Sequence, residues 1–196
     1  MVIVFLIFWP LVASLLVFGF SSQAKSIALG ASLIELVVSL VAAFNFIPNE
    51  SIQFVVNVPW IQSVGINFHV GMDGISLLLV LLTTFLIPFI ILSSFSTSYK
   101  NQGSFYGLIL LMQMALVGVF VALDGFLFYL FWEMALVPVY FICLIWGGDD
   151  RGRITLKFFI YTLAGSLLML IALVYLYCQT CADRAFENID TPERST

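Results

Sequence analysis

Long runs of apolar residues separated by short polar connections dominate the chain. A helix needs about 20 apolar residues to cross the hydrocarbon core of a bilayer. These runs are apolar on every face and do not alternate with period two, so they predict helices and not the strands of a membrane barrel. The sequence therefore predicts an all-α integral membrane protein of about six transmembrane helices, at Val2–Phe20, Ser26–Ile47, Gly74–Phe95, Phe105–Leu123, Phe126–Trp146 and Ile154–Tyr177.

The connections divide the chain into three regions. Residues 1–103 hold the first three predicted helices, with a long loop at 48–72 that contains Pro59-Trp60 and is expected on the membrane surface. Residues 104–178 hold the next three helices. Residues 179–196 are polar and without pattern, which is typical of a disordered tail. No Lys or Arg precedes the first run, so we interpret it as a retained helix and not as a cleaved signal peptide.

Composition supports the membrane interpretation. Hydrophobic residues make up 62% of the chain and charged residues 9%, whereas a soluble domain has about 25% charged residues. The net charge is −4, which leaves no basic face for phosphates. These values exclude a disordered protein, a nucleic-acid binder and an ordinary soluble enzyme.

Basic residues in the short loops predict the orientation of the chain. Lys25, Lys100, Arg151 and Arg153 all follow odd-numbered helices, whereas the N-terminus and the loops after helices two and four have no basic residue. Because basic loops stay on the cytoplasmic or matrix side, we expect the N-terminus outside. Both a bacterial inner membrane and a mitochondrial inner membrane fit this pattern.

Glu133 is the residue with the strongest candidate chemistry. It lies within about three residues of the centre of the fifth predicted helix, roughly 4.5 Å from the midplane. Burial of an acid at this depth is costly unless it is hydrated, paired or protonated. Pro138 has no N–H, so the carbonyl of Met134, next to Glu133, loses its helical partner and favours local water. The sequence predicts a proton relay at Glu133, the alternative being a protonated side chain bonded to another helix.

Two further charged residues are weaker candidates for the relay. Lys157 lies near the inner end of the sixth helix, where its side chain can snorkel to the surface. Helix rise predicts a depth gap of roughly 15 Å between Lys157 and Glu133, which only water or intermediate groups can bridge. Glu35 is central in the second helix, and Ser32 and Ser39 share its face. We interpret it as a protonated side chain satisfied by these serines, with a relay role as the alternative.

Other polar residues are expected to be structural. Asp73 precedes the third helix and is expected to cap it, whereas Asp124 is expected to be solvated in a tight turn. His69 has no evident partner, and Cys178-x-x-Cys181 lacks a second ligand pair. The chain has no phosphate-binding glycine loop, metal-binding helix motif or haem signature. We therefore expect no cofactor, metal or catalytic residue in this chain.

Three stretches resemble a known family. The runs FWEMALVPVYF at Phe131–Phe141 and RITLKFFIYT at Arg153–Thr162 are similar to signatures of the antiporter-like membrane subunits of respiratory complex I, the NADH–quinone oxidoreductases. GMDGISL at Gly71–Leu77 resembles the entry to the family's third helix. The resemblance covers roughly Met1 to Tyr177.

The resemblance implies both a fold and a function. Members have about fourteen helices in two inverted repeats with flanking helices, so this chain would correspond to the first part, and residues 104–178 to the start of the proton-translocating domain. It implies that Glu133 is a central proton-relay residue that works with a lysine on a broken seventh helix. It also implies that NADH, flavin, iron–sulfur clusters and quinone are bound by partner subunits, and that the chain's partners are other membrane-arm subunits and the lipid bilayer.

The residues leave other functions open. Neither the lysine-bearing seventh helix nor the second repeat is present in these 196 residues, which a truncated, split or frameshifted subunit would explain. A subunit of a multisubunit cation/proton antiporter shares the same helix-five glutamate. A non-transporting scaffold or remnant is the third hypothesis.

Overall fold

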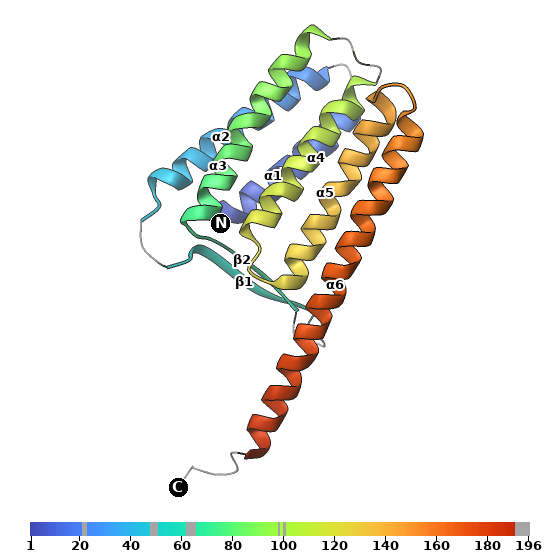
Figure 1. Cartoon of the computed structure of the whole chain (residues 1–196). Helices are drawn as coiled ribbons and strands as arrows, with labels where there is room; N and C mark the ends of the chain where they lie inside the picture. The colour runs from blue at the N-terminus through green and yellow to red at the C-terminus, as the bar shows by residue number, and fades with distance from the viewer. Residues whose placement is uncertain (21–22, 48–50, 62–65, 98, 100, 191–196) are drawn as a thin grey trace. The chain divides into compact units, whose positions relative to one another are not determined.

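Six long helices and one two-stranded hairpin form the protein in a computed structural model that describes residues 1–20, 23–47, 51–61, 66–97, 99 and 101–190, with the backbone alone for residues 181–190. All six described helices are long and apolar enough to cross a membrane (Figure 1). The predicted all-α membrane fold is confirmed. The helices are α1 (Val2–Gly19), α2 (Ala24–Phe44), α3 (Gly74–Ser93), α4 (Gln102–Val121), α5 (Gly125–Trp146) and α6 (Arg151–Asp190).

Aspartates set the start of two of these helices. The backbone N–H of Ser76 donates to Asp73 Oδ1 at 2.7 Å, so Asp73 caps α3 as predicted. The N–H groups of Phe126 and Leu127 donate to Asp124 Oδ1 at 2.9 and 3.1 Å. Asp124 thus caps α5, a role that the sequence analysis missed when it left this side chain to solvent. Both carboxylates satisfy backbone donors that a helix start leaves free.

Helix α4 is the centre of the bundle in residues Met1–Leu156, the first of two compact units. It packs against α1, α2, α3 and α5, and 67% of its span is buried. Small residues permit these close approaches. Ser14 Oγ of α1 donates to the carbonyl of Gly107 at 2.8 Å, and a Cβ on Gly118 would lie 2.4 Å from the ring of Phe131 on α5.

A β-hairpin occupies most of the segment that the sequence predicts as a surface loop. Strand β1 (Gln53–Ile61) pairs antiparallel with β2 (Ile66–Met72) across one end of the helices (Figure 1). The N–H of Leu123 donates to the carbonyl of His69 at 2.9 Å, which ties β2 to the turn between α4 and α5. The β-branched and aromatic residues between Gln53 and Trp60 are the signal that could have predicted the strand. Residues 48–50 and 62–65 of the predicted loop, and Lys100, lie outside the described residues.

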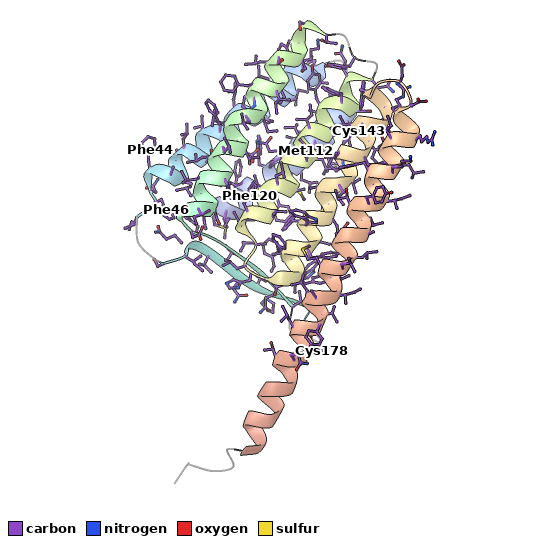
Figure 2. The ribbon with its side chains drawn as sticks, in the orientation of Figure 1. Phe44, Phe46, Met112, Phe120, Cys143 and Cys178 are labelled. Carbon is purple, nitrogen blue, oxygen red and sulfur yellow. The ribbon has the colours of Figure 1, made fainter. Side chains whose placement is uncertain are left out.

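The bundle has two apolar clusters stacked along its helices. The hairpin-side cluster includes Leu6, Ile7, Val80, Met114 and Val117. Phe120 of α4 packs against this cluster and lies toward the hairpin end of the helix in Figure 2. The far-side cluster lies toward the opposite helix ends and consists of Ala13, Val17, Ala24, Ala28, Ala31, Ile87, Ile91, Tyr106, Ile109 and Leu110. Both are built from helices far apart in sequence.

Helix α6 enters the second compact unit at Lys157 and continues to Asp190. The structure therefore differs from the disordered tail predicted at 179–196, at least as far as Asp190. The sequence between Gly165 and Pro192 contains neither glycine nor proline, so nothing in it interrupts the helical backbone. Residues 191–196 lie outside the described part of the chain.

Candidate functional site

Glu133 lies near the middle of α5 and is the only charged residue in that helix. Its side chain is half-buried. Its Oε1 atom is buried, and no hydrogen-bond partner lies within reach of it among the described residues. A buried polar atom without a partner is costly, so this oxygen needs a group from outside the described residues, such as water or another helix.

The rotation of α5 turns Glu133 away from α4. Leu127, Phe131 and Pro138 are the buried residues of α5 and mark the side that packs into the bundle. Successive helical residues differ by about 100°, so Glu133 is about 200° around the helix from Phe131. The carboxyl therefore leaves α5 on the side opposite the ring that packs against Gly118.

Pro138 adds a second polar group beside Glu133. It is buried within the helix, and its ring nitrogen cannot donate to the carbonyl of Met134. A carboxyl and a carbonyl without a helical donor thus occupy neighbouring positions near mid-span. Such an arrangement favours a bound water or a polar side chain.

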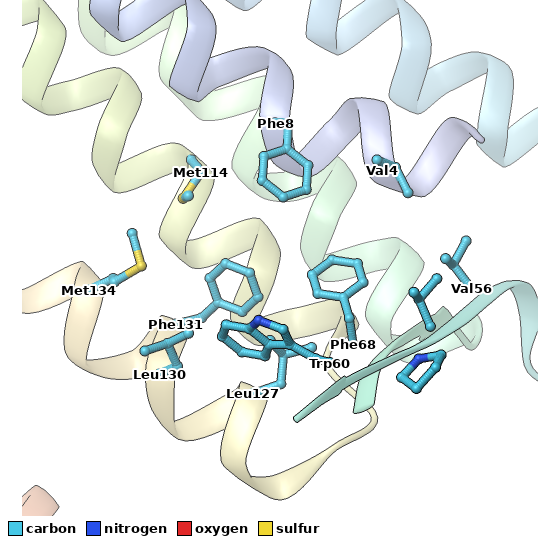
Figure 3. Close-up of a pocket in the computed structure, with 12 residues that line it drawn as sticks. Val4, Phe8, Val56, Trp60, Phe68, Met114, Leu127, Leu130, Phe131 and Met134 are labelled. Carbon is cyan, nitrogen blue, oxygen red and sulfur yellow. The ribbon is translucent and has the colours of Figure 1, made fainter. Parts of the chain in front are cut away.

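An apolar cavity of about 520 Å³ lies on another side of α5, next to the hairpin (Figure 3). Met134 and Leu130 point into it from α5, together with Phe8 from α1 and Trp60 from β1. Glu133 is not among the residues that line it. Because the lining is apolar, this cavity supplies no polar contact for the carboxyl.

Glu35 has a more closed environment than Glu133. It is 0% exposed in the middle of α2, and neither carboxyl oxygen has a hydrogen-bond partner among the described side chains and backbone. The prediction that serines satisfy it is wrong. Ser32 Oγ donates to the carbonyl of Leu29 at 2.9 Å, and Ser39 Oγ donates to that of Leu36 at 2.8 Å. Each hydroxyl prefers the backbone of its own helix, a common alternative for serine.

Lys157 and His69 are the remaining residues that the sequence analysis considered. Lys157 is exposed, near the start of α6 and at the first residue of the second unit. Its link to Glu133 through water stays a prediction. His69 lies in β2 opposite Asn57. Among the described residues, no three His, Cys, Asp or Glu side chains are close enough to hold a metal ion.

Gln113 on α4 is a polar residue that the sequence analysis missed. Its side chain is 0% exposed, and both its amide nitrogen and its amide oxygen lack a hydrogen-bond partner within the described part of the chain. The signal was available, because Gln113 is the only amide side chain beyond the first residue of an otherwise apolar span.

Comparison with known proteins finds relatives over most of the chain and a family model over part of it. Residues 122–193 match the family model described as NADH:quinone oxidoreductase/Mrp antiporter, TM. The chain is 44% identical over 177 residues to F(420)H(2) dehydrogenase subunit M of Methanosarcina mazei, covering 88% of this chain and 35% of that protein. It is 37% identical over 179 residues to NADH-quinone oxidoreductase subunit M of Rickettsia prowazekii, covering 87% of this chain and 36% of that protein.

A solved structure shares the fold. A chain of respiratory complex I from Thermus thermophilus superposes with a TM-score of 0.78 at 26% sequence identity, over 89% of this chain and 35% of that one. The chain therefore spans about a third of the length of the relatives that it matches.

Proposed function

Because this chain is related to the antiporter-like membrane subunits of NADH:quinone oxidoreductase over about a third of their length, we propose that it is a proton-translocating part of such a subunit. In this proposal it couples electron transfer from NADH to quinone with the movement of protons through Glu133. The N-terminus lies outside an energy-coupling inner membrane, and other membrane-arm subunits surround the chain.

The buried, unpartnered Oε1 of Glu133 carries the proposal. An acid that holds and releases protons needs partners that can change, and a fully satisfied carboxyl in a closed core does not have them. Glu133 emerges from α5 on the side opposite its contact with α4, and the carbonyl of Met134 is available beside it. Water or a basic group on this side of α5 would complete a relay, as intramembrane acids do in proton pathways.

Redox chemistry belongs to partner subunits in this proposal. NADH, flavin, iron–sulfur clusters and quinone would bind there, and this chain would contribute no redox centre. The two relatives support this division, because their names give different electron donors for the same type of subunit. A membrane subunit that only moves protons has no need to distinguish those donors.

A subunit of a multisubunit cation/proton antiporter is the second candidate. The matching family model includes the Mrp antiporters as well as the oxidoreductases. Glu133 would have the same role there, but an ion gradient and not electron transfer would drive it. Co-purification separates the two candidates, because only an oxidoreductase subunit should be isolated with iron–sulfur proteins.

The test is the Glu133→Gln variant of the complex in inverted vesicles prepared from the native membrane. Gln has nearly the same shape but cannot release a proton. We expect the variant to assemble and electron-driven acidification of inverted vesicles to fall by at least tenfold, whereas Glu133→Asp keeps part of the activity. Unchanged acidification in a fully assembled Glu133→Gln complex would contradict the relay.

A chain that co-purifies with no other subunit would support the remaining hypothesis, a non-transporting scaffold or remnant.

Thr162→Val in α6, the next helix along the chain, provides a matched control for the acidification test. Its hydroxyl donates only to the carbonyl of Phe158 within α6, so its loss should leave acidification unchanged.

A further inference from the structure

A layer of polar side chains separates the two apolar clusters of the bundle. On α3, Thr83 and Thr84 lie between Val80 of the hairpin-side cluster and Ile87 of the far-side cluster. On α4, Gln113 lies between Leu110 of the far-side cluster and Met114 of the hairpin-side cluster. On both helices, polar residues therefore lie between the residues of one cluster and those of the other.

Helix α2 makes the same transition at Glu35. Ala31 belongs to the far-side cluster, and Val38 packs against the hairpin-side cluster. One turn from Glu35, Ser39 Oγ lies 2.8 Å from Thr84 Oγ1, so a hydrogen bond connects α2 to α3 within the layer. Since α2 also packs against α4, Glu35, Thr84 and Gln113 all lie where their helices pass from one apolar cluster to the other.

This layer, defined here by Glu35, Ser39, Thr84 and Gln113, is closed and only partly satisfied. All four side chains are 0% exposed. Ser39 and Thr84 bond each other, but the four polar atoms of Glu35 and Gln113 have no partner among the residues that the structure describes. Without a further group, four such atoms would destabilise the bundle, because each gives up its hydrogen bonds to water and gains none in return.

No opposite charge is available for Glu35 from the helices packed around it. The sequences of α1 and α3 contain no acid or base, and α4 contributes only Tyr106, whose hydroxyl accepts a hydrogen bond from Ser94. Lys25, on α2 itself, donates to the carbonyl of Phe95 at 3.0 Å and starts about 15 Å from Glu35 along the helix. An ionised Glu35 would therefore be an uncompensated buried charge.

We propose that this layer is an internal water-binding site in which Glu35 carries a proton and is linked through bound water to Gln113. A protonated carboxyl donates one hydrogen bond and accepts others, and a primary amide does both. Buried waters typically make about three hydrogen bonds to groups of this kind. The carbonyl of Thr84 is a further acceptor, because Pro88 has no N–H to donate to it.

The site is distinct from the proposed relay at Glu133 and does not rest on it. The apolar clusters close the layer on both sides along the helices, and α4 separates α2 from the contact with α5. The layer therefore holds its proton and water as part of the fold, and it would do so even if Glu133 moved no protons.

Infrared spectroscopy of the isolated complex tests the proposal directly. A protonated buried carboxyl has a carbonyl stretch that is separate from the band of an ionised one. We expect this band in the unmodified complex and expect it to persist in Glu133→Gln and to disappear in Glu35→Gln. Gln113→Leu should shift the band, because the water-mediated link is lost, and transfer to deuterated water should shift it as the carboxyl proton exchanges.

Three outcomes would overturn the proposal. A protonated-carboxyl band left unchanged by Glu35→Gln would mean that the band does not come from Glu35 and that Glu35 is ionised. A band that appears only after sodium is removed would assign the layer to a bound cation. A band unaffected by Gln113→Leu would exclude the link between the two side chains.

Discussion

Helices α2 and α5 each carry a glutamate near the middle of a membrane span, but they present it to opposite kinds of surroundings. Glu35 points into a bundle where three helices exclude all solvent from it. Glu133 is half-buried on a helix of which only 11% is buried, and it leaves that helix away from α4. The same residue type thus occurs once inside a closed layer and once beside an open face.

The difference shows that mid-membrane depth alone does not identify a relay. Both acids have buried oxygens without partners among the described residues. What separates them is whether groups outside the bundle can reach the carboxyl. The surroundings of Glu35 are complete apart from bound water, whereas those of Glu133 require a further helix or a wet passage.

A positive charge at Glu35 or at Glu133 should produce the largest difference between the two positions. Glu35→Lys places an unpaired ammonium group among apolar clusters, at a cost of about 3 kcal/mol or more, which is much of the stability of a typical domain. Glu133→Lys lies on the open side of α5 and should be tolerated better. We expect clearly less monodisperse complex for Glu35→Lys after detergent extraction, and equal yields of the two variants would contradict the difference.

The contact between α4 and α5 fixes the rotation that turns Glu133 outward. Gly118→Ala puts a methyl group 2.4 Å from the ring of Phe131, so the ring or the backbone of α5 must move. Overpacking of this kind costs about 1–3 kcal/mol, and the midpoint of thermal unfolding should fall. Gly30→Ala is the matched control, because a Cβ there meets nothing within 4 Å. A midpoint that falls equally in both variants would mean that the contact does not hold α5.

A double-mutant cycle measures whether Glu35 and Gln113 act together. Each single change to Leu leaves the other side chain without its water-linked partner and should destabilise the bundle. The double variant replaces both polar groups with apolar ones, so we expect it to be more stable than the sum of the single effects, by about 0.5–3 kcal/mol. Denaturant unfolding of the extracted complex provides the measurement, and additive effects would show that the two residues are independent.

The aspartate that caps α3 should make the stability of the protein depend on pH. The N–H and hydroxyl of Ser76 lower the pKa of Asp73 from its usual value. The stabilisation from this cap is therefore full above the unfolded pKa of about 3.9 and is lost as the pH falls through the lower folded value. Asp73→Ala should cost about 1 kcal/mol at neutral pH. The difference in unfolding free energy between the unmodified protein and Asp73→Ala should become smaller in acid. A difference that does not depend on pH would exclude the ionised cap.

The sequence was sufficient for the helices because burial in a bilayer requires long apolar runs. It predicted the first five helices to within about three residues at each end, the start of α6, and Asp73 as a cap, but not the continuation of α6 to Asp190. It missed the hairpin, because the mixed polar and apolar residues of β1 and β2 also fit a loop at the membrane surface. It could not predict that Ser32 and Ser39 would bond their own backbone, or that Gln113, like Glu35, would lie between the two apolar clusters. Those features depend on helix rotation and packing, which hydrophobic runs without a strong polar side do not specify.

The number of protons moved per electron pair, compared between Glu133→Gln and Glu35→Gln in the assembled complex, tests the central claim most directly. If Glu133 is the relay and Glu35 a closed proton-holding residue, the ratio should fall in Glu133→Gln and remain at the unmodified value in Glu35→Gln. An unchanged ratio in Glu133→Gln, or an equal fall in both variants, would contradict the functional difference between the two glutamates.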